Sequence, residues 1–195
     1  MSEKGSYPKG VAKREEILRA ALEIFSQEGY RGTSLREVAR ACNLSLPGLM
    51  HYFNSKEELL AAILQKRDEQ DFATTHTDGD DAFKTLSAIT RHNAQVPGLV
   101  QLYATLSAAA SDPAHPAHDF FVARYNDFRA RLAQSLRERQ DAGTLAAGLD
   151  ADKLAAIVIA LADGMQVQWM LDPHMDMAEH LDYFLELLGA ISPSR

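Results

Sequence analysis

The spacing of hydrophobic positions predicts helices along nearly the whole chain, and no stretch shows the strict alternation that is typical of a β-strand. Clusters of Gly, Pro, Asp and Asn separate these segments, most clearly at residues 112–116. The pattern therefore predicts an all-α protein. Apolar residues recur at helical spacing over residues 11–28, 56–75, 80–95, 99–110, 117–140, 150–171 and 177–188.

Two short helices are predicted between residues 33 and 57. Ser34 precedes Glu37 by three positions, which is the spacing of a capping box, and Ser45 is a candidate cap of the second helix. Asn43 lies between these two helices and tolerates the left-handed backbone of a tight turn. Ser55 and Glu58 have the spacing of a second capping box, at the start of the following helix. A helix, a tight turn and a second short helix, expected at about residues 46–52, form a helix-turn-helix motif, whose second helix enters the DNA major groove.

The run from Arg14 to Leu60 resembles the DNA-binding domain of the tetracycline-repressor (TetR) family. The resemblance implies a three-helix DNA-binding domain at residues 1–56 and a helical ligand-binding and dimerisation domain at residues 57–195, with about nine helices in all. The residues that carry it are Ile17, Leu18, Ala20, Ala21, Phe25, Gly29, Tyr30, Thr33, Ser34, Val38, Ala39, Leu44, Ser45, Leu49, Phe53, Ser55, Lys56, Glu57 and Leu60.

The resemblance also implies which residues of the DNA-binding domain, here called the head, contact DNA; the second domain is called the body. Phosphate contacts are expected from Tyr52 and Lys56. Ser34 and Arg36, at the start of the helix that precedes the recognition helix, should contact the DNA backbone too. Many family members have Thr or Ala at the position of Gly48 and Tyr at the position of Met50. This chain therefore lacks a methyl or hydroxyl group that could contact a thymine methyl, and it lacks a phenolic hydroxyl donor. Base-specific hydrogen bonds should then be few and rest chiefly on His51. A large share of affinity should then come from phosphate contacts and DNA shape. The full candidate set is Thr33, Ser34, Arg36, Ser45, Leu46, Pro47, Gly48, Met50, His51, Tyr52 and Lys56.

The charge distribution supports a nucleic-acid-binding head on a separate body. The whole chain has a net charge of −7. Residues 1–56 contain nine Lys or Arg and six Glu. Residues 57–195 contain the other 11 Lys or Arg and the other 21 Asp or Glu. A basic head on an acidic body is the asymmetry expected of such a protein.

The body is expected to bind a small-molecule effector of apolar or aromatic character. Its aromatic and thioether side chains, with a few polar groups, are typical of small-molecule cavities, although each of them is also an ordinary core residue. Asp163 is the most unusual, because a carboxylate in an apolar helix needs a partner: an internal group, a second subunit or a ligand. The candidates are Phe72, Phe83, His92, Tyr103, Leu106, Phe121, Tyr125, Asp163, Met165 and Trp169.

The segment from Leu154 to Leu161 is apolar on every side, which predicts that a second subunit covers one of its faces. With the last helix, it would form a four-helix interface of a homodimer, as in TetR-like proteins. The candidate interface residues are Leu154, Ile157, Val158, Leu161, Leu181, Phe184, Leu185 and Leu188.

Other functional classes have little support in the sequence. No phosphate loop, nucleophile motif or metal-ligand spacing is found, so no enzyme activity, metal or cofactor is expected. One cysteine, a polar start and no apolar run of about 20 residues fit a cytoplasmic, nucleoid-associated protein without a membrane partner. The sequence favours a repressor that binds double-stranded DNA at an inverted repeat and is released by an effector. A sequence-tolerant DNA-binding protein, or an activator without an effector, is the alternative.

Overall fold

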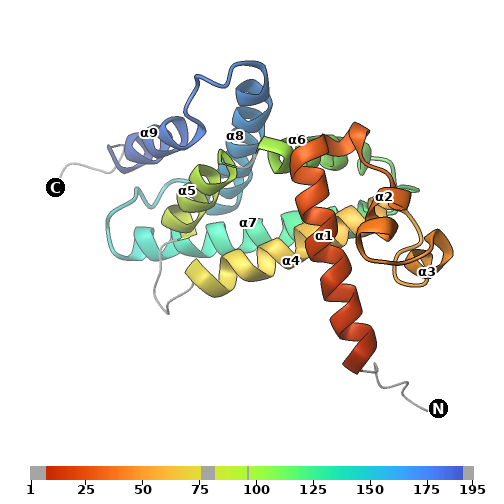
Figure 1. The fold of residues 1–195 in the computed structure, drawn as a ribbon. Helices are drawn as coiled ribbons and strands as arrows, with labels where there is room; N and C mark the ends of the chain where they lie inside the picture. Colours follow the sequence, from red (N-terminus) through yellow and green to blue (C-terminus); the bar gives the residue numbers. More distant parts are fainter. Residues whose placement is uncertain (1–7, 76–81, 96, 191–195) are drawn as a thin grey trace, which may run out of the picture.

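A computed structural model describes residues 8–75, 82–95 and 97–190 (Figure 1). Within these ranges the fold is all-α, as predicted. The helices are α1 (Pro8–Gly32), α2 (Leu35–Ala41), α3 (Leu46–Met50), α4 (Lys56–Thr75), α5 (Ala82–Asn93), α6 (Pro97–Ala109), α7 (His118–Asp141), α8 (Ala151–Leu171) and α9 (Met177–Ala190).

The first three helices form a head at one end of the molecule (Figure 1). Gly29 interrupts α1 with φ of 70° and ψ of 178°, so the last turn is a separate helical piece. Asn43 has the predicted left-handed conformation, with φ of 54°, between α2 and α3. α3 ends at Met50, two residues earlier than the sequence predicted, because the chain turns at His51 and Tyr52.

The predicted caps form at the head helices, with one difference. Ser34 accepts a hydrogen bond from the backbone N–H of Glu37, whose carboxylate accepts one from the Ser34 N–H in return. At the start of α4, Ser55 accepts from the Glu58 N–H at 3.0 Å, but the Glu58 carboxylate binds Asn54 instead of completing a second capping box. Caps of this kind fix where each short helix begins.

Helix α4 joins the head to the body. Leu59, Leu60 and Ile63, from its first two turns, are buried in one core with Ile17 and Phe25 of the head. The same core continues into α6 and the start of α7, so the predicted boundary after residue 56 divides one continuous hydrophobic core. That boundary stays a prediction.

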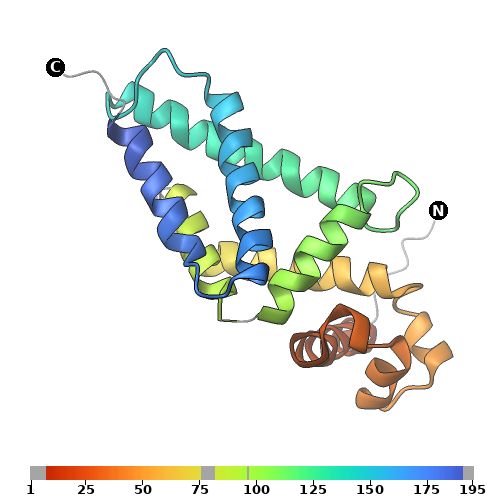
Figure 2. The same cartoon turned by 90° about the horizontal axis from the view of Figure 1, so that it is seen from above.

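Helices α5, α8 and α9 pack at the end of the molecule away from the head, and the long helices α4 and α7 extend between the two ends (Figure 2). Two further apolar cores fill this body: one between α5, α7, α8 and α9, and a smaller one around Trp169. In the described part of the chain, α8 alone has the length and apolar composition of a membrane span. The core helix of a globular protein passes the same test, and α8 contributes to both body cores.

Candidate DNA-binding head and effector cavity

Helix α3 presents a small exposed face whose opposite side anchors it in the head. Leu49 and Phe53 are fully buried, as the predicted spacing requires. Met50 is 45% exposed, and Pro47 and His51 are also exposed. Ser45 accepts a hydrogen bond from the Gly48 N–H at 3.2 Å, so its side chain caps the helix. The predicted reading residues therefore lie on one accessible surface with little hydrogen-bonding capacity beyond His51.

The start of α2 is a second exposed surface of the head. Ser34 and Arg36 are exposed there, where the helix N-terminus favours anions such as phosphate. Thr33 differs from the prediction, because its side chain is only 3% exposed and its hydroxyl donates to the Gly29 carbonyl at 3.0 Å. Thr33 therefore stabilises the α1–α2 junction.

The side chain of Lys56 is held against the head. Its Nζ donates to the Thr33 carbonyl oxygen at 2.6 Å and lies 5.6 Å from the centre of the Phe25 ring. Burial lowers the pKa of Lys56, while Glu57 and Glu37 oppose the shift. A mutation of Lys56 will therefore perturb the packing of the head together with any phosphate contact.

A cavity of about 120 Å³ lies in the body between α4, α5, α6, α7 and α8. Most of its wall surface is apolar, and charged groups lie on α4, α7 and α8. The lining residues are Leu64, Arg67, Asp68, Ala82, Thr85, Leu86, Ile89, Thr90, Asn93, Leu99, Val100, Tyr103, Arg124, Phe128, Arg131, Leu132, Ile159, Ala162, Asp163 and Gln166.

A polar network crosses one wall of this cavity. Arg124 of α7 binds Asp68 of α4 through two hydrogen bonds, of 2.5 and 3.0 Å, and donates a third to the Tyr103 hydroxyl at 3.0 Å. The two oxygens of Asp163 accept from Tyr103 at 3.1 Å and from Tyr125 at 2.6 Å. Asp163 therefore has internal partners, which is one of the three possibilities that the sequence left open.

Burial perturbs the titration of this network. It raises the pKa of Asp163, although hydrogen bonds from Tyr125 and Tyr103 and the charge of Arg124 oppose the shift. Burial, followed by the hydrogen bond to Asp163, raises the pKa of Tyr125 to about 12, and burial raises the pKa of Tyr103 well above its usual value. Burial is the largest single influence on Arg124 and lowers its pKa, but the hydrogen bond to Asp68 and the charges of Tyr103, Asp68 and Asp163 together outweigh burial, so the pKa is raised overall.

The structure divides the predicted ligand-binding residues into several groups. Tyr103 and Asp163 line the cavity, and Tyr125 reaches it through its hydrogen bond to Asp163. His92 is exposed outside the lining, whereas its neighbour Asn93 lies within it. Phe72 belongs to α4, but its side chain lies outside what the structure describes. The remaining candidates are buried in the hydrophobic cores and are not among the lining residues of the cavity: Phe83, Leu106, Phe121, Met165 and Trp169.

The charged lining residues Arg67, Asp68, Arg124 and Arg131 were missed from the sequence. Helical spacing was one available signal, because Arg67 falls on the apolar face of its helix with Ile63 and Leu64. Arg124 falls beside the apolar face that carries Phe121 and Phe128. Asp68 and Arg124 are 56 residues apart, so no local pattern relates them to each other.

The predicted dimer residues also separate into two groups. Val158, Leu181 and Leu188 are almost fully buried inside this chain, so they are corrected to core residues without surface left for a partner. Leu154, Leu161, Phe184 and Leu185 are partly buried against the same core. Ile157 is 52% exposed and remains accessible. The prediction omitted four other large exposed apolar side chains of α8 and α9, which are Val167, Leu171, Tyr183 and Leu187.

Comparisons with known proteins follow the two parts of the fold. Residues 17–63 match the family described as bacterial regulatory proteins of the TetR family. Residues 93–190, just over half of the chain, match the family described as BetI-type transcriptional repressor, C-terminal.

Curated relatives match in the head. The regulator RutR of Escherichia coli K12 is 46% identical over 55 residues, which cover 28% of this chain and 26% of RutR. UidR of the same strain is 40% identical over 60 residues, which cover 31% of each chain. The matched stretches span less than a third of the length of these relatives.

Solved structures share the whole fold at low sequence identity. A TetR-family regulator from a Rhodococcus species aligns with a TM-score of 0.72 at 20% identity, over 91% of this chain and 99% of that one. A regulator from Saccharomonospora viridis, solved in complex with choline, has a TM-score of 0.69 at 24% identity, over 90% and 96% of the two chains. FadR of Bacillus subtilis, solved with stearoyl-CoA, has a TM-score of 0.69 at 19% identity, over 90% and 97%. On the helix-turn-helix head, the helical body and the two family matches together, this chain belongs to the TetR family of transcriptional regulators.

Proposed function

We propose that this protein is a homodimeric repressor that binds an inverted-repeat operator and releases it when a small molecule occupies the cavity of the body. The observation that carries the proposal is the position of α4. Leu59 and Leu60 of this helix lie in the core of the head, while Arg67 and Asp68 line the cavity.

Helix α4 is the element through which the two sites would be coupled. Lys56 and Arg67 are 11 residues apart, which corresponds to about 16 Å along a helix axis. The first turn is fixed to the head by the bond from Lys56 to the Thr33 carbonyl, and a later turn is fixed to α7 by the pair of Asp68 and Arg124. A ligand that changes the position of α4 in the body therefore changes the position of the head.

The dimer would form through the exposed apolar faces of α8 and α9. Ile157, Gly164 and Leu171 are spaced seven residues apart along α8, which places them on one side of the helix. Val167 lies between Gly164 and Leu171, so the accessible residues form one stripe. Tyr183 and Leu187 continue the apolar surface on α9 and are 62% and 44% exposed. Two copies would bury these stripes together and orient their heads in the same direction.

A two-fold dimer accounts for both DNA recognition and release. Two heads can enter successive major grooves only if their recognition helices lie about 34–36 Å apart. A ligand that favours a different distance weakens operator binding by its differential affinity for the two conformations, typically about 5–150-fold.

The effector would be small in the conformation described here. The structural relatives were solved with choline and stearoyl-CoA, which shows that their common fold accommodates ligands of very different size. A cavity of about 120 Å³ is close to the ~150 Å³ engineered cavity that holds benzene, so it accommodates a single ring or a short chain.

The test has two stages. Genomic fragments bound by the purified protein are first selected and sequenced, and an inverted repeat is the expected result. Small molecules that stabilise the protein thermally are then added to the complex with labelled operator. Release of the operator supports the proposal, while selection of unrelated sequences, or unchanged affinity at saturating ligand, contradicts it.

One observation favours a second candidate, a sequence-tolerant DNA-binding protein. The accessible positions of α3 include Leu46, Pro47, Gly48 and Met50, which offer no side-chain hydrogen bond to a base edge. Competition with random DNA separates the candidates, since a specific repressor binds its operator about 10³-fold or more tightly than unrelated sequence.

A further inference from the structure

The charged groups of the cavity wall are unbalanced. Among the described lining residues there are three guanidinium groups, of Arg67, Arg124 and Arg131, and two carboxylates, of Asp68 and Asp163. The described lining therefore carries one more positive than negative group, although the body as a whole is acidic. A cavity of this sign attracts an anion.

Both carboxylates already have partners. Asp68 receives two hydrogen bonds from Arg124, and Asp163 receives one from each of two tyrosines. A cationic ligand would have to displace these partners to reach either carboxylate.

The aromatic faces that could surround a cation are covered from within the protein. The guanidinium carbon of Arg124 lies 4.8 Å from the centre of the Tyr103 ring and 4.2 Å from that of Phe128. Rings at this distance from a cation already make the interaction that a quaternary ammonium ligand would need. Arg124 thus excludes a second cation from its own position.

Arg67 is the cationic group in a position to bind an anion. It is half-buried on α4, and its Nη2 donates to the side-chain oxygen of Asn93, a neutral partner, at 3.1 Å. No described carboxylate lies within ion-pair distance of its guanidinium. A guanidinium has several N–H donors in one plane, and their geometry matches the two oxygens of a carboxylate.

The rest of the wall would hold an apolar body attached to that anion. Leu86, Ile89, Val100 and Ile159 line the same cavity as Arg67. The volume of about 120 Å³ limits this body to about one ring or a short chain.

We propose that the effector is a small organic monocarboxylate whose carboxylate pairs with Arg67 and whose apolar body occupies the cavity. This inference rests on the proposed function, because it names the class of ligand that the repressor would sense. Arg67 is adjacent in sequence to Asp68, so the ligand would bind α4 beside its existing link to α7. The ligand's charge would therefore act on the helix that carries the head.

The test measures ligand binding to the purified full-length protein by isothermal titration calorimetry and thermal shift. The probes are pairs of similar shape: benzoate with benzamide, and butyrate, hexanoate and octanoate with their primary amides. Choline and phenyltrimethylammonium represent cations. We expect at least one carboxylate to bind at least tenfold more tightly than its amide, and the two cations to give no saturable binding.

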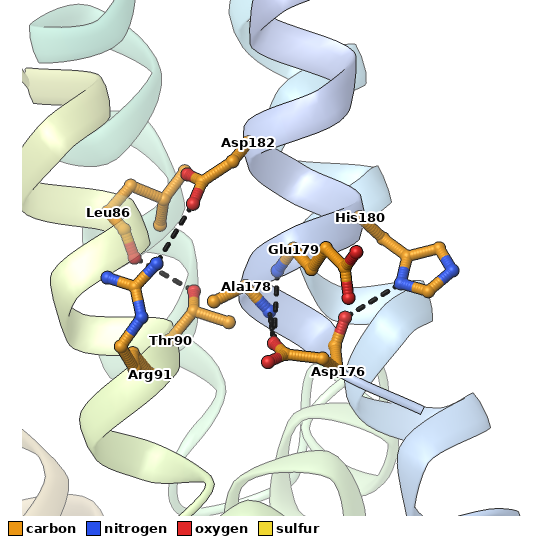
Figure 3. Close-up of polar contacts among 8 residues, drawn as sticks. All are labelled: Leu86, Thr90, Arg91, Asp176, Ala178, Glu179, His180 and Asp182. Carbon is orange, nitrogen blue, oxygen red and sulfur yellow. Dashed lines mark hydrogen bonds and ion pairs between the residues drawn. The ribbon is translucent and has the colours of Figure 1, made fainter. Parts of the chain in front are cut away.

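The variant Arg67→Gln should reduce this preference at least tenfold, because Gln keeps a side-chain amide near Asn93 but has no charge. Arg91→Gln is the matched control and should bind as the unmodified protein does, because Arg91 lies on the outer face of α5 and pairs with Asp182 of α9 at 2.9 Å (Figure 3). Circular dichroism of both variants checks that they are folded.

Three results would overturn the inference: binding of a cation, equal binding of each carboxylate and its amide, or no binding of any carboxylate at millimolar concentration. An unchanged preference in folded Arg67→Gln would do so as well. Because calorimetry requires no DNA, these results are separate from the proposed function, which fails instead if the protein selects no operator or if bound ligand leaves operator affinity unchanged.

Discussion

The link between α4 and the body can be measured by breaking the pair of Arg124 and Asp68. Their side chains are 14% and 21% exposed, and the contact has two hydrogen bonds. Removing one partner of a fully buried pair costs about 3–5 kcal/mol, and an exposed pair contributes about 0–1 kcal/mol. This pair lies nearer the buried limit, so Arg124→Met should reduce the free energy of unfolding by about 2–3 kcal/mol.

The rest of the network sets the size of the effect in each variant. Arg124→Met keeps much of the stem that packs against Phe128, but removes the cation above that ring and the donor to the Tyr103 hydroxyl. Asp68→Asn keeps the shape and one acceptor oxygen, so we expect about 1–2 kcal/mol. The double variant should lose less than the sum of the two, with a coupling of about 1–2 kcal/mol, because neither charge is then left without its partner.

Urea unfolding followed by circular dichroism at one fixed protein concentration gives these values, since the proposed dimerisation would make the apparent stability depend on concentration. The control cycle uses Arg91 and Asp182, an ion pair between α5 and α9 whose side chains are 58% and 40% exposed (Figure 3). Its coupling should stay below about 1 kcal/mol. If the Arg124–Asp68 coupling were no larger than this control, α4 would not be held to α7 in the way described.

Three further predictions concern the head, the dimer and the network. Gly29→Ala should lower the free energy of unfolding by about 1–3 kcal/mol in urea titrations, because φ is 70° and the new Cβ would lie 3.1 Å from the Gln101 side chain. The control Gly189→Ala, on α9 where a new Cβ would meet no atom within 4 Å, should not destabilise the protein. Equal effects would contradict this reason. Ile157→Glu should shift sedimentation towards monomer, whereas Val122→Glu, with a similar exposure on α7, should leave the dimer intact; a dimer in both would exclude the α8 face. Folding raises the pKa of Tyr125 from its usual 10.0 to about 12, so the neutral phenol contributes stability that is complete below pH 10 and is lost as the pH rises to about 12. Urea titrations across this pH range should show a smaller loss in Tyr125→Phe. Identical alkaline profiles of the two proteins would contradict the role of burial.

The helix-turn-helix was predictable because its signals are local. Ser34, Asn43 and Ser45 act on backbone groups within a few residues, and each adopts the predicted role. The role of Lys56 was not visible, because its contact with the Thr33 carbonyl joins positions 23 residues apart. The end of α3 was also misplaced, since a single turn of helix has too few residues for periodicity to define where it stops.

The body was predicted as helices but not as a site. The apolar run in α8 indicated burial on all sides without showing which side faces the core of this chain. Two adjacent residues of this run differ in their burial: Val158 is fully buried, whereas Ile157 is 52% exposed. Aromatic side chains were chosen as cavity lining, yet Phe83 and Trp169 fill the cores. The charged groups in the cavity wall come from α4, α7 and α8, and they meet only in the folded chain.

Coupling between the cavity and the DNA-binding head through α4 can be measured by a fluorescence anisotropy titration of labelled operator with and without a saturating ligand identified by thermal shift. The ligand should weaken operator binding by about 5–150-fold, and saturating operator should weaken ligand binding by the same factor. An operator affinity that is the same in both titrations would contradict this coupling.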